Sequence, residues 1–184
     1  MPCWPMPVLN PFAFCLEFTL AFEGGYTNRA SDPGNWTGGA VGVGVCKGTN
    51  FGISAKAYPN LDIINLTREQ AAAIYFRDYW TPLRCAEMLV EVALAVFDTA
   101  VNLGPHYAIE ELQITAGVTA DGDIGPVTLA AVRNQSPPHL VGDYLARRID
   151  TYVKLSAEHP EFLSGWTMRT ISLAMTVGGL IHAN

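Results

Sequence analysis

The distribution of glycine constrains the fold of this chain more than any other feature of its sequence. Eight of the 17 glycines fall within residues 24–50, a segment without a helical period that contains the turn signals DPG and TGG. Glycine adopts left-handed backbone conformations without steric cost, so this segment predicts a long loop with a short hairpin through AVGVGV, residues 40–45. Loops of this length in compact domains usually serve a function.

Helical patterns fill most of the remaining sequence. The apolar run 12–22 predicts a mostly buried helix that the following double glycine ends. Thr67 and Gln70 have the spacing of a capping box at the start of the next helix. Residues 86–103 are apolar on nearly all sides, which predicts a central core helix. Further helices are expected at 107–116, from Pro126, at 139–157 and at 162–175. The predicted fold class is therefore mainly α, with a small glycine-rich β/loop region near the N-terminus.

Composition and charge exclude several classes of protein. Hydrophobic residues make up 49% of the chain and charged residues 15%, which indicates a globular protein. The net charge is −6, and no lysine or arginine occurs within residues 86–132. A nucleic-acid binder needs cations to neutralise phosphates, so no nucleic acid is expected as a partner. The first residues lack the basic region of a secretory signal. No apolar run reaches the roughly 20 residues of a spanning helix, so no stable membrane span is expected.

The potential metal ligands of the sequence do not form a recognisable site. The loop from Asp121 to Gly125 has some features of a calcium loop, but Val132 stands where the final glutamate of such a loop should be. The cysteines form no CxxC pair and no group with histidine, which disfavours zinc. Their even number permits two disulfides without requiring them, and free thiols are favoured. No metal or cofactor is expected. The four cysteines are Cys3, Cys15, Cys46 and Cys85.

A single glutamate, Glu23, lies where an apolar run meets two glycines in "LAFEGGYTNRASDPG", residues 20–34. Cleavage of a glycosidic bond needs an acid that keeps its proton near neutral pH, and such a carboxyl is partly removed from water. A glutamate at the end of an apolar helix, facing an open glycine loop, is suitably placed for this. Glu23 is therefore the candidate general acid, and an ordinary exposed glutamate near a helix end is the alternative.

Asp32 and Thr49 are candidates for the opposite side of such a site. An inverting hydrolase activates water with a second carboxylate, roughly 6.5–9.5 Å from the acid. The loop that carries Asp32 can supply this group if it folds back on the helix end. An aspartate before Pro-Gly is also a common turn residue. Thr49, in "KGTNFGIS", has a hydroxyl that can orient a water or a sugar.

Aromatic and amide side chains are candidates for lining a sugar groove. Aromatic faces suit the apolar faces of sugar rings, and amides suit N-acetyl and hydroxyl groups. For Asn102, which interrupts an apolar helix end, a structural role is equally open. The predicted substrate-binding residues are Tyr26, Trp36, Tyr58, Asn102 and Tyr107.

Other polar and aromatic residues are assigned to the interior. Trp80 and Tyr75 stand at helical spacing from core positions, so burial is favoured over sugar contact. Asp98 lies within the most apolar helix, and a buried carboxylate needs partners, so a structural hydrogen-bonding role is favoured over catalysis. Three cations are expected to pair with the acidic middle segment, and a contact to the acidic peptide stems of peptidoglycan is the disfavoured alternative. They are Arg147, Arg148 and Arg169.

These motifs, in this order, resemble the glycoside hydrolase family 108 lysozymes, which are muramidases of phages and Gram-negative bacteria. "FEGGYTNRASDPG", "GTNFGIS" and "FDTAVNLG" carry the resemblance. The family's general acid is the glutamate of EGGY, which implies Glu23. Phage lysozymes more broadly have an aspartate nine residues after the acid, matched by Asp32, and a threonine shortly afterwards. Here "NWTGGAVGVGVCK" intervenes before Thr49, so either the cleft loop carries an insertion or Thr37 takes that position.

A second block, "LQITAGVTADGDIGPVTLAAV" at 112–132, resembles the small peptidoglycan-binding-like module that commonly follows the EGGY domain. Together the two resemblances imply a lysozyme-like helical catalytic domain at 12–105 and a helical peptidoglycan-binding-like module at 106–170. The two can pack as one globule. An apolar tail at 171–184 follows.

The resemblance implies a peptidoglycan hydrolase that cleaves the β-1,4 bond between N-acetylmuramic acid and N-acetylglucosamine by general acid catalysis. Asp32 would either position the attacking water or stabilise the oxocarbenium-like transition state. The alternatives are a lytic transglycosylase acting on the same bond and a non-catalytic wall-binding or secretion-accessory protein. The expected partner is the glycan strand of peptidoglycan, bound by a monomer. A phage endolysin of this type would accumulate in the host cytoplasm and reach the periplasm and cell wall through a holin pore.

Overall fold

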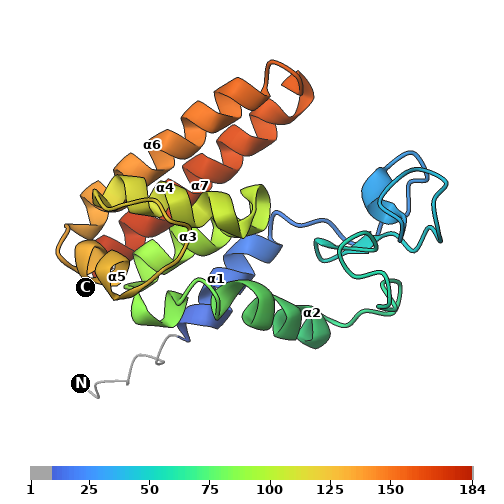
Figure 1. The fold of residues 1–184 in the computed structure, drawn as a ribbon, viewed down its shortest axis with the longest axis horizontal. Coiled ribbons are helices and arrows are strands. Elements are labelled where there is room, and N and C mark those ends of the chain that lie inside the picture. The colour runs from blue at the N-terminus through green and yellow to red at the C-terminus, as the bar shows by residue number, and fades with distance from the viewer. Residues whose placement is uncertain (1–9, 184) are drawn as a thin grey trace, which may run out of the picture. The chain divides into compact units, whose positions relative to one another are not determined.

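The computed structural model describes residues 10–183, and within them the fold is mainly α, as predicted (Figure 1). The chain forms two compact units: a hairpin unit, residues 16–77, and a helical unit, residues 10–15 together with 78–183. The hairpin consists of β1 (Thr49–Asn50) and β2 (Ile53–Ser54), which pair antiparallel. The helices are α1 (Pro11–Leu20), α2 (Arg68–Tyr75), α3 (Val90–Leu103), α4 (Pro105–Ala116), α5 (Pro126–Arg133), α6 (Pro137–Leu155) and α7 (Leu163–Ala183).

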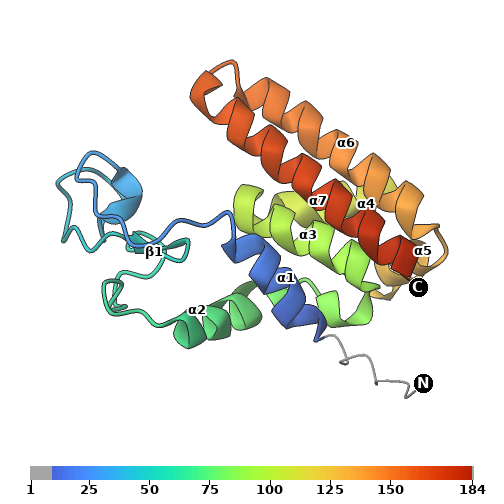
Figure 2. The same cartoon turned by 180° about the vertical axis from the view of Figure 1, so that it is seen from behind.

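Helix α3 is the centre of the helical unit. Every residue from 91 to 100 is buried, and α3 packs against α4, α6 and α7 (Figure 1 and Figure 2). The core helix predicted at 86–103 is therefore present, although it begins at Val90. Residues 85–87 form a separate 3-10 turn before it. Trp80, predicted to be buried, is 3% exposed and meets the rings of Phe12 and Phe97 edge-on.

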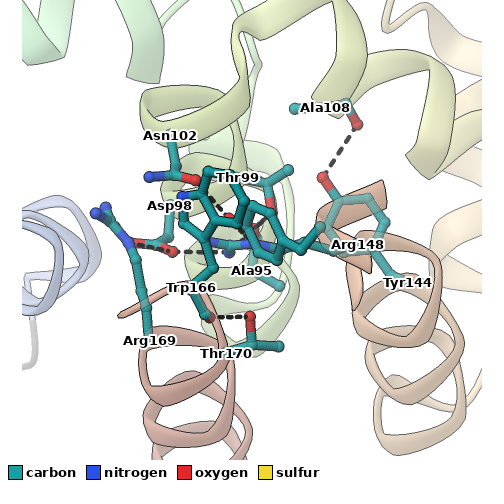
Figure 3. A network of polar contacts seen from close by, with 11 residues as sticks. Ala95, Asp98, Thr99, Asn102, Ala108, Tyr144, Arg148, Trp166, Arg169 and Thr170 are labelled. Carbon is teal, nitrogen blue, oxygen red and sulfur yellow. Dashed lines mark hydrogen bonds and ion pairs between the residues drawn. The ribbon is translucent and has the colours of Figure 1, made fainter. Parts of the chain in front are cut away.

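A buried ion cluster joins α3 to α6 and α7 (Figure 3). The Asp98 carboxylate is fully buried and accepts hydrogen bonds from Arg148 Nη1 at 2.8 Å and from Arg169 Nη2 at 2.8 Å. Burial raises the pKa of Asp98, but the positive charges of the two arginines outweigh burial and hold that pKa below its ordinary value. The predicted structural role of Asp98 and the predicted pairing of both arginines are confirmed. Arg147 likewise pairs with Glu111.

The hairpin unit is built on a long irregular loop. The hairpin predicted at 40–45 is wrong: this stretch is a loop, closed by a bridge between Trp36 and Cys46 and by a backbone hydrogen bond from Thr37 to Val45. The two-stranded hairpin forms further along, at 49–54. The glycines explain the difference, because Gly42 and Gly44 both have φ of +80°, which an extended strand does not allow.

Helix α2 begins as its sequence predicts. The Thr67 hydroxyl accepts from the Gln70 backbone N–H, and the Gln70 side chain accepts from the Thr67 backbone N–H, which completes the capping box. Tyr75, the last residue of α2, is 1% exposed, as predicted.

The C-terminal helix extends beyond its predicted end. Helix α7 runs to Ala183, so most of the predicted apolar tail at 171–184 continues the same helix. Within residues 10–183 no helix combines the length and the apolar character that crossing a membrane requires.

The cysteines of the described segment are free thiols, as favoured from the sequence. Cys15 and Cys85 are buried, whereas Cys46 is partly exposed. Burial, with a smaller effect of the Asp98 charge, raises the pKa of the Cys15 thiol to about 12. Burial also raises the pKa of Cys85. Both thiols are therefore unreactive at neutral pH. Cys3 lies outside the described residues.

Candidate active site

Glu23 follows the end of α1 on a short helical turn. The helix ends at Leu20, and the backbone N–H of Glu23 donates to the Leu20 carbonyl at 3.2 Å, so the turn holds the glutamate close to the helix end. The side chain is partly buried. The predicted position, at the end of an apolar helix and before a glycine turn, agrees with the structure.

The Glu23 carboxyl lies against the turn of the β1–β2 hairpin. A Cβ atom placed on Gly52 would stand 2.7 Å from Oε2 of Glu23 and 2.5 Å from the hydroxyl oxygen of Tyr75. Contacts below 3.0 Å are too short for carbon, so only glycine lets the backbone come this close to the carboxyl. Gly52 also has φ of +75°, which glycine tolerates best.

Tyr75 fixes this turn from the end of α2. Its hydroxyl donates to the carbonyl of Phe51 at 2.8 Å. Phe51 itself has φ of +49°, an uncommon conformation for a residue with a side chain. A backbone held in such a conformation next to a candidate acid is typical of functional sites. The sequence did not single out Gly52 or the Tyr75 hydroxyl; the only signal available was the short turn between Asn50 and Ile53.

The chain after Glu23 returns to the same hairpin. Thr27 and Thr49 exchange two backbone hydrogen bonds, of 2.9 and 2.8 Å. Gly48 allows this approach, because a Cβ atom there would lie 2.4 Å from the Thr27 carbonyl oxygen. The hairpin is thus held by residues on both sides of the EGGY motif and by α2.

Asp32 is exposed and caps a short 3-10 helix, Pro33–Asn35. Its Oδ1 accepts a hydrogen bond from the Gly34 backbone N–H at 2.8 Å. Its other carboxylate oxygen has no hydrogen-bond partner within the described part of the chain. Asp32 therefore has the turn role that its DPG context suggests, and one oxygen can still bind a water. Its catalytic role stays a prediction.

Thr49 is hydrogen-bonded to the short 3-10 helix that Asp32 caps. Its hydroxyl donates to Oδ1 of Asn35 at 2.7 Å, and the buried Asn35 amide donates to the Arg29 carbonyl at 3.0 Å. Thr37, the alternative third residue, accepts a hydrogen bond from the Val45 backbone N–H and closes the glycine-rich loop. Asn35 thus connects the loop of Asp32 to the hairpin, while the assignment of Thr49 as the third catalytic residue stays a prediction.

The three predicted aromatic residues of the hairpin unit have different surroundings. Tyr26 is 39% exposed and lines a hollow of about 370 Å³. Tyr58 lines a second hollow of about 390 Å³. The indole N–H of Trp36 donates to the Ala30 carbonyl at 2.8 Å, which supports the loop. Tyr26 and Tyr58 therefore border hollows, whereas the polar group of Trp36 is used within the protein.

The other two predicted substrate-binding residues lie in the helical unit. Asn102 accepts a hydrogen bond from the hydroxyl of Tyr152 (Asn102 is labelled in Figure 3). The hydroxyl of Tyr107 donates to Thr151 at 2.8 Å. Both side chains thus have partners between helices, and their sugar contacts stay a prediction.

The described residues contain no group of three or more His, Cys, Asp or Glu side chains arranged to hold a metal ion. In the loop around Asp121 the amide of Gln113 takes the central place: it donates to Oδ1 of Asp121 and to the hydroxyl of Thr128. This loop is therefore organised by hydrogen bonds from a protein side chain.

Comparison with known families divides the chain into two matched regions. Residues 16–104 match the family described as glycosyl hydrolase 108, and residues 107–171 match the family described as a predicted peptidoglycan domain. Residues 16–104, which carry Glu23 and Asp32, therefore belong to the glycosyl hydrolase 108 family. The combination defines the class of protein: a glycoside hydrolase directed at peptidoglycan.

A solved structure shares this architecture over nearly the whole chain. SagA from Brucella abortus is similar with a TM-score of 0.75 and 28% sequence identity, over 91% of this chain and 94% of that one. A search of curated proteins found no match.

Proposed function

We propose that this protein is an N-acetylmuramidase, which hydrolyses the β-1,4 bond between N-acetylmuramic acid and N-acetylglucosamine in peptidoglycan. The observation that carries the proposal is the position of the Glu23 carboxyl, partly buried against Gly52 and the Tyr75 hydroxyl in the glycosyl hydrolase 108 region. Glu23 donates its proton to the leaving glycosidic oxygen.

Asp32 has the complementary role in this proposal. Its exposed carboxylate is held at one oxygen by the Gly34 N–H and has a second oxygen available for water. It either activates the water that attacks the anomeric carbon or stabilises the oxocarbenium-like transition state. The glycosidic C–O bond breaks, and the proton of Glu23 goes to the leaving oxygen. The oxygen of water bonds to the anomeric carbon, and the proton that this water loses passes to Asp32 or to solvent, from which Glu23 is protonated again.

Glu23→Gln tests the acid, because it preserves the shape of the side chain and removes the proton donor. We expect the clearing rate of purified cell walls to fall at least about 100-fold, since general acids contribute about 10²–10⁴-fold. Glu17→Gln is the matched control: Glu17 lies on α1, the helix that precedes Glu23, and forms an exposed ion pair with Arg68. Near wild-type clearing by Glu23→Gln would exclude Glu23 as the acid.

Asp32→Asn tests the second carboxylate. The amide keeps an oxygen that can cap the 3-10 turn, so the substitution isolates the loss of charge. We expect a partial loss of rate without loss of folding, measured by turbidity and circular dichroism. An unchanged rate would mean that another group activates the water.

The products distinguish the two reactions that one glutamate can support. Hydrolysis adds one water to each cleaved bond, whereas a lytic transglycosylase leaves an anhydromuramic end that lacks this water. Mass spectrometry of fragments released from purified walls should show reducing muramic ends. Anhydromuramic ends would assign the protein to the transglycosylases, and no released fragment at all would favour a non-catalytic wall-binding protein.

We also propose a biological setting, that of a phage-type endolysin made in the cytoplasm of its host. The resemblance of the EGGY block to phage lysozymes supports this. Expression in a Gram-negative host should cause lysis only when a holin is co-expressed. Lysis without a holin, by a protein whose Glu23→Gln variant is inert, would indicate another route to the wall.

A further inference from the structure

The hollow next to Tyr26 is a feature of the hairpin unit that the proposed reaction does not use. Its volume is about 370 Å³, within the range of small-ligand sites. One wall carries Tyr26 and the segment around Lys47, and the facing wall is the segment 60–64. The lining side chains used below are Tyr26, Cys46, Lys47, Asn60, Asp62 and Ile64.

This hollow is connected through the backbone to the candidate acid. Tyr26 follows Glu23 by three residues, and its ring packs on Gly48, where a Cβ atom would lie 2.8 Å from the ring carbon Cε2. Gly48 leads directly into Thr49 of the hairpin, whose turn contacts the Glu23 carboxyl. A ligand in the hollow would therefore touch residues that belong to the same two segments as the site.

Lys47 holds the two walls together. Its ammonium donates to the carbonyl of Pro59 at 2.7 Å and to the carbonyl of Leu61 at 3.4 Å. These bonds fix the segment 59–61 against the segment that leads to the hairpin. The cation is thus largely used for positioning the wall, which reduces its capacity to attract an anionic ligand.

The charges and surfaces of the lining favour an uncharged sugar. The lining contains one cation, Lys47, and one anion, Asp62, so no net charge selects for a carboxylate. The ring of Tyr26 is 39% exposed and Ile64 is 58% exposed, which provides apolar surface for a sugar face and an acetyl methyl. The exposed amide of Asn60 can both donate to and accept from an acetamido group.

We propose that this hollow is a subsite for one uncharged N-acetylated sugar of the glycan strand, an N-acetylglucosamine residue. The assignment of the ligand rests on the proposed muramidase function. The peptide stem of peptidoglycan carries carboxylates and finds no matching net charge here, so it is the disfavoured occupant.

Cys46 gives a direct readout of occupancy. Its thiol is partly exposed in the wall of the hollow, whereas Cys15 and Cys85 are buried thiols with raised pKa values. In the full chain carrying Glu23→Gln and Cys3→Ser, Cys46 is the expected site of labelling by a thiol reagent. We expect a soluble oligomer of N-acetylglucosamine to slow this labelling in a saturable way, and an anionic stem peptide at the same concentration to leave it unchanged.

Substitutions in the wall locate the ligand. Tyr26→Ala and Asn60→Ala should each raise the half-protecting oligomer concentration about tenfold, which corresponds to about 1.4 kcal/mol. Tyr26→Phe keeps the ring and should retain protection of Cys46. This result would show that the loss of protection in Tyr26→Ala comes from the missing ring. Asn134→Ala, an exposed amide of the helical unit, is the matched control for Asn60→Ala.

The outcomes separate this subsite from the proposed function. Absence of protection, protection by the stem peptide, or equal protection in Asn60→Ala and Asn134→Ala would overturn the subsite. In a different outcome, the sugar oligomer protects Cys46 although the protein with the native Glu23 clears no cell walls. That result would support the subsite and overturn the proposed hydrolysis.

Discussion

Replacing Gly52 by alanine is expected to reduce the clearing of cell walls about 100-fold while destabilising the protein only modestly. Two effects contribute. Alanine at a φ of +75° costs about 1–2 kcal/mol of folding free energy, because its Cβ approaches the following carbonyl. The same Cβ would stand 2.7 Å from Glu23 Oε2 and 2.5 Å from the Tyr75 hydroxyl.

The magnitude follows from how these short contacts are relieved. The Glu23 carboxyl is the end of a flexible side chain and can give way at little cost, whereas the buried Tyr75 hydroxyl can move only by losing its hydrogen bond to Phe51, which adds about 1 kcal/mol. To restore a normal contact, the Glu23 carboxyl must move by about 1 Å, and a misplacement of that size can cost about 10²-fold in rate. This is about 2.7 kcal/mol of transition-state stabilisation.

Gly42→Ala is the matched control. Gly42 has nearly the same backbone conformation, with φ of +80°, but no atom lies within 4 Å of the position that a Cβ would take. Both variants therefore carry the same backbone strain, and only Gly52→Ala disturbs the carboxyl. Initial rates of turbidity loss on purified walls and thermal unfolding by circular dichroism measure the two effects. Equal clearing rates for the two variants would refute the claim that Gly52 positions the acid.

Three further predictions concern stability. Asp98→Asn should destabilise the protein by about 3–5 kcal/mol in denaturant unfolding, because it leaves the buried cations of Arg148 and Arg169 without their anion. Since the pKa of Asp98 in the folded protein lies below its ordinary value, the wild-type protein should lose this stabilisation as the pH falls below about 4. The free energy of unfolding of Asp98→Asn should lack this part of the pH dependence. Tyr75→Phe removes the hydrogen bond to the hairpin turn, so it should lower the free energy of unfolding by about 1 kcal/mol and measurably reduce the clearing rate. An unchanged rate would mean that the turn keeps its conformation without this hydrogen bond. Thr67→Ala removes the cap of α2 and should cost about 1 kcal/mol without changing the products, and a loss below 0.3 kcal/mol would contradict the capping role.

The parts of the fold that depend on residues close together in the sequence could be predicted from it. The capping box of Thr67 and Gln70 is complete within four residues, so its pattern is sufficient to place the start of α2. The core helix around Asp98 could be predicted because its apolar residues leave no polar face. The structural role of Asp98 could also be predicted, since a carboxylate among apolar side chains requires hydrogen-bonding partners. That two arginines are these partners is seen only in the structure.

The hairpin could not be predicted, because its stability comes from distant residues. Valine alternating with glycine at 40–45 favours a strand by pattern, but glycines with positive φ turn this stretch into a loop. The observed turn instead places Phe51 in a left-handed conformation, which its own sequence disfavours. The hydroxyl of Tyr75, 24 residues away, accounts for this by binding the Phe51 carbonyl. A contact at that separation has no local signal.

Two acids of this chain, Asp98 and Glu23, show that burial alone does not identify a catalytic acid. Asp98 is the more deeply buried, but two arginines bind it and lower its pKa, so it stays ionised and cannot donate a proton near neutral pH. Glu23 is only partly buried, and its carboxyl lies against the backbone of Gly52 in the turn of the hairpin. A general acid must reach the substrate and give up a proton, and a carboxylate enclosed by two arginines can do neither. Of these two acids, the glutamate of the glycine turn is accessible from the surface, whereas the aspartate of the core is not.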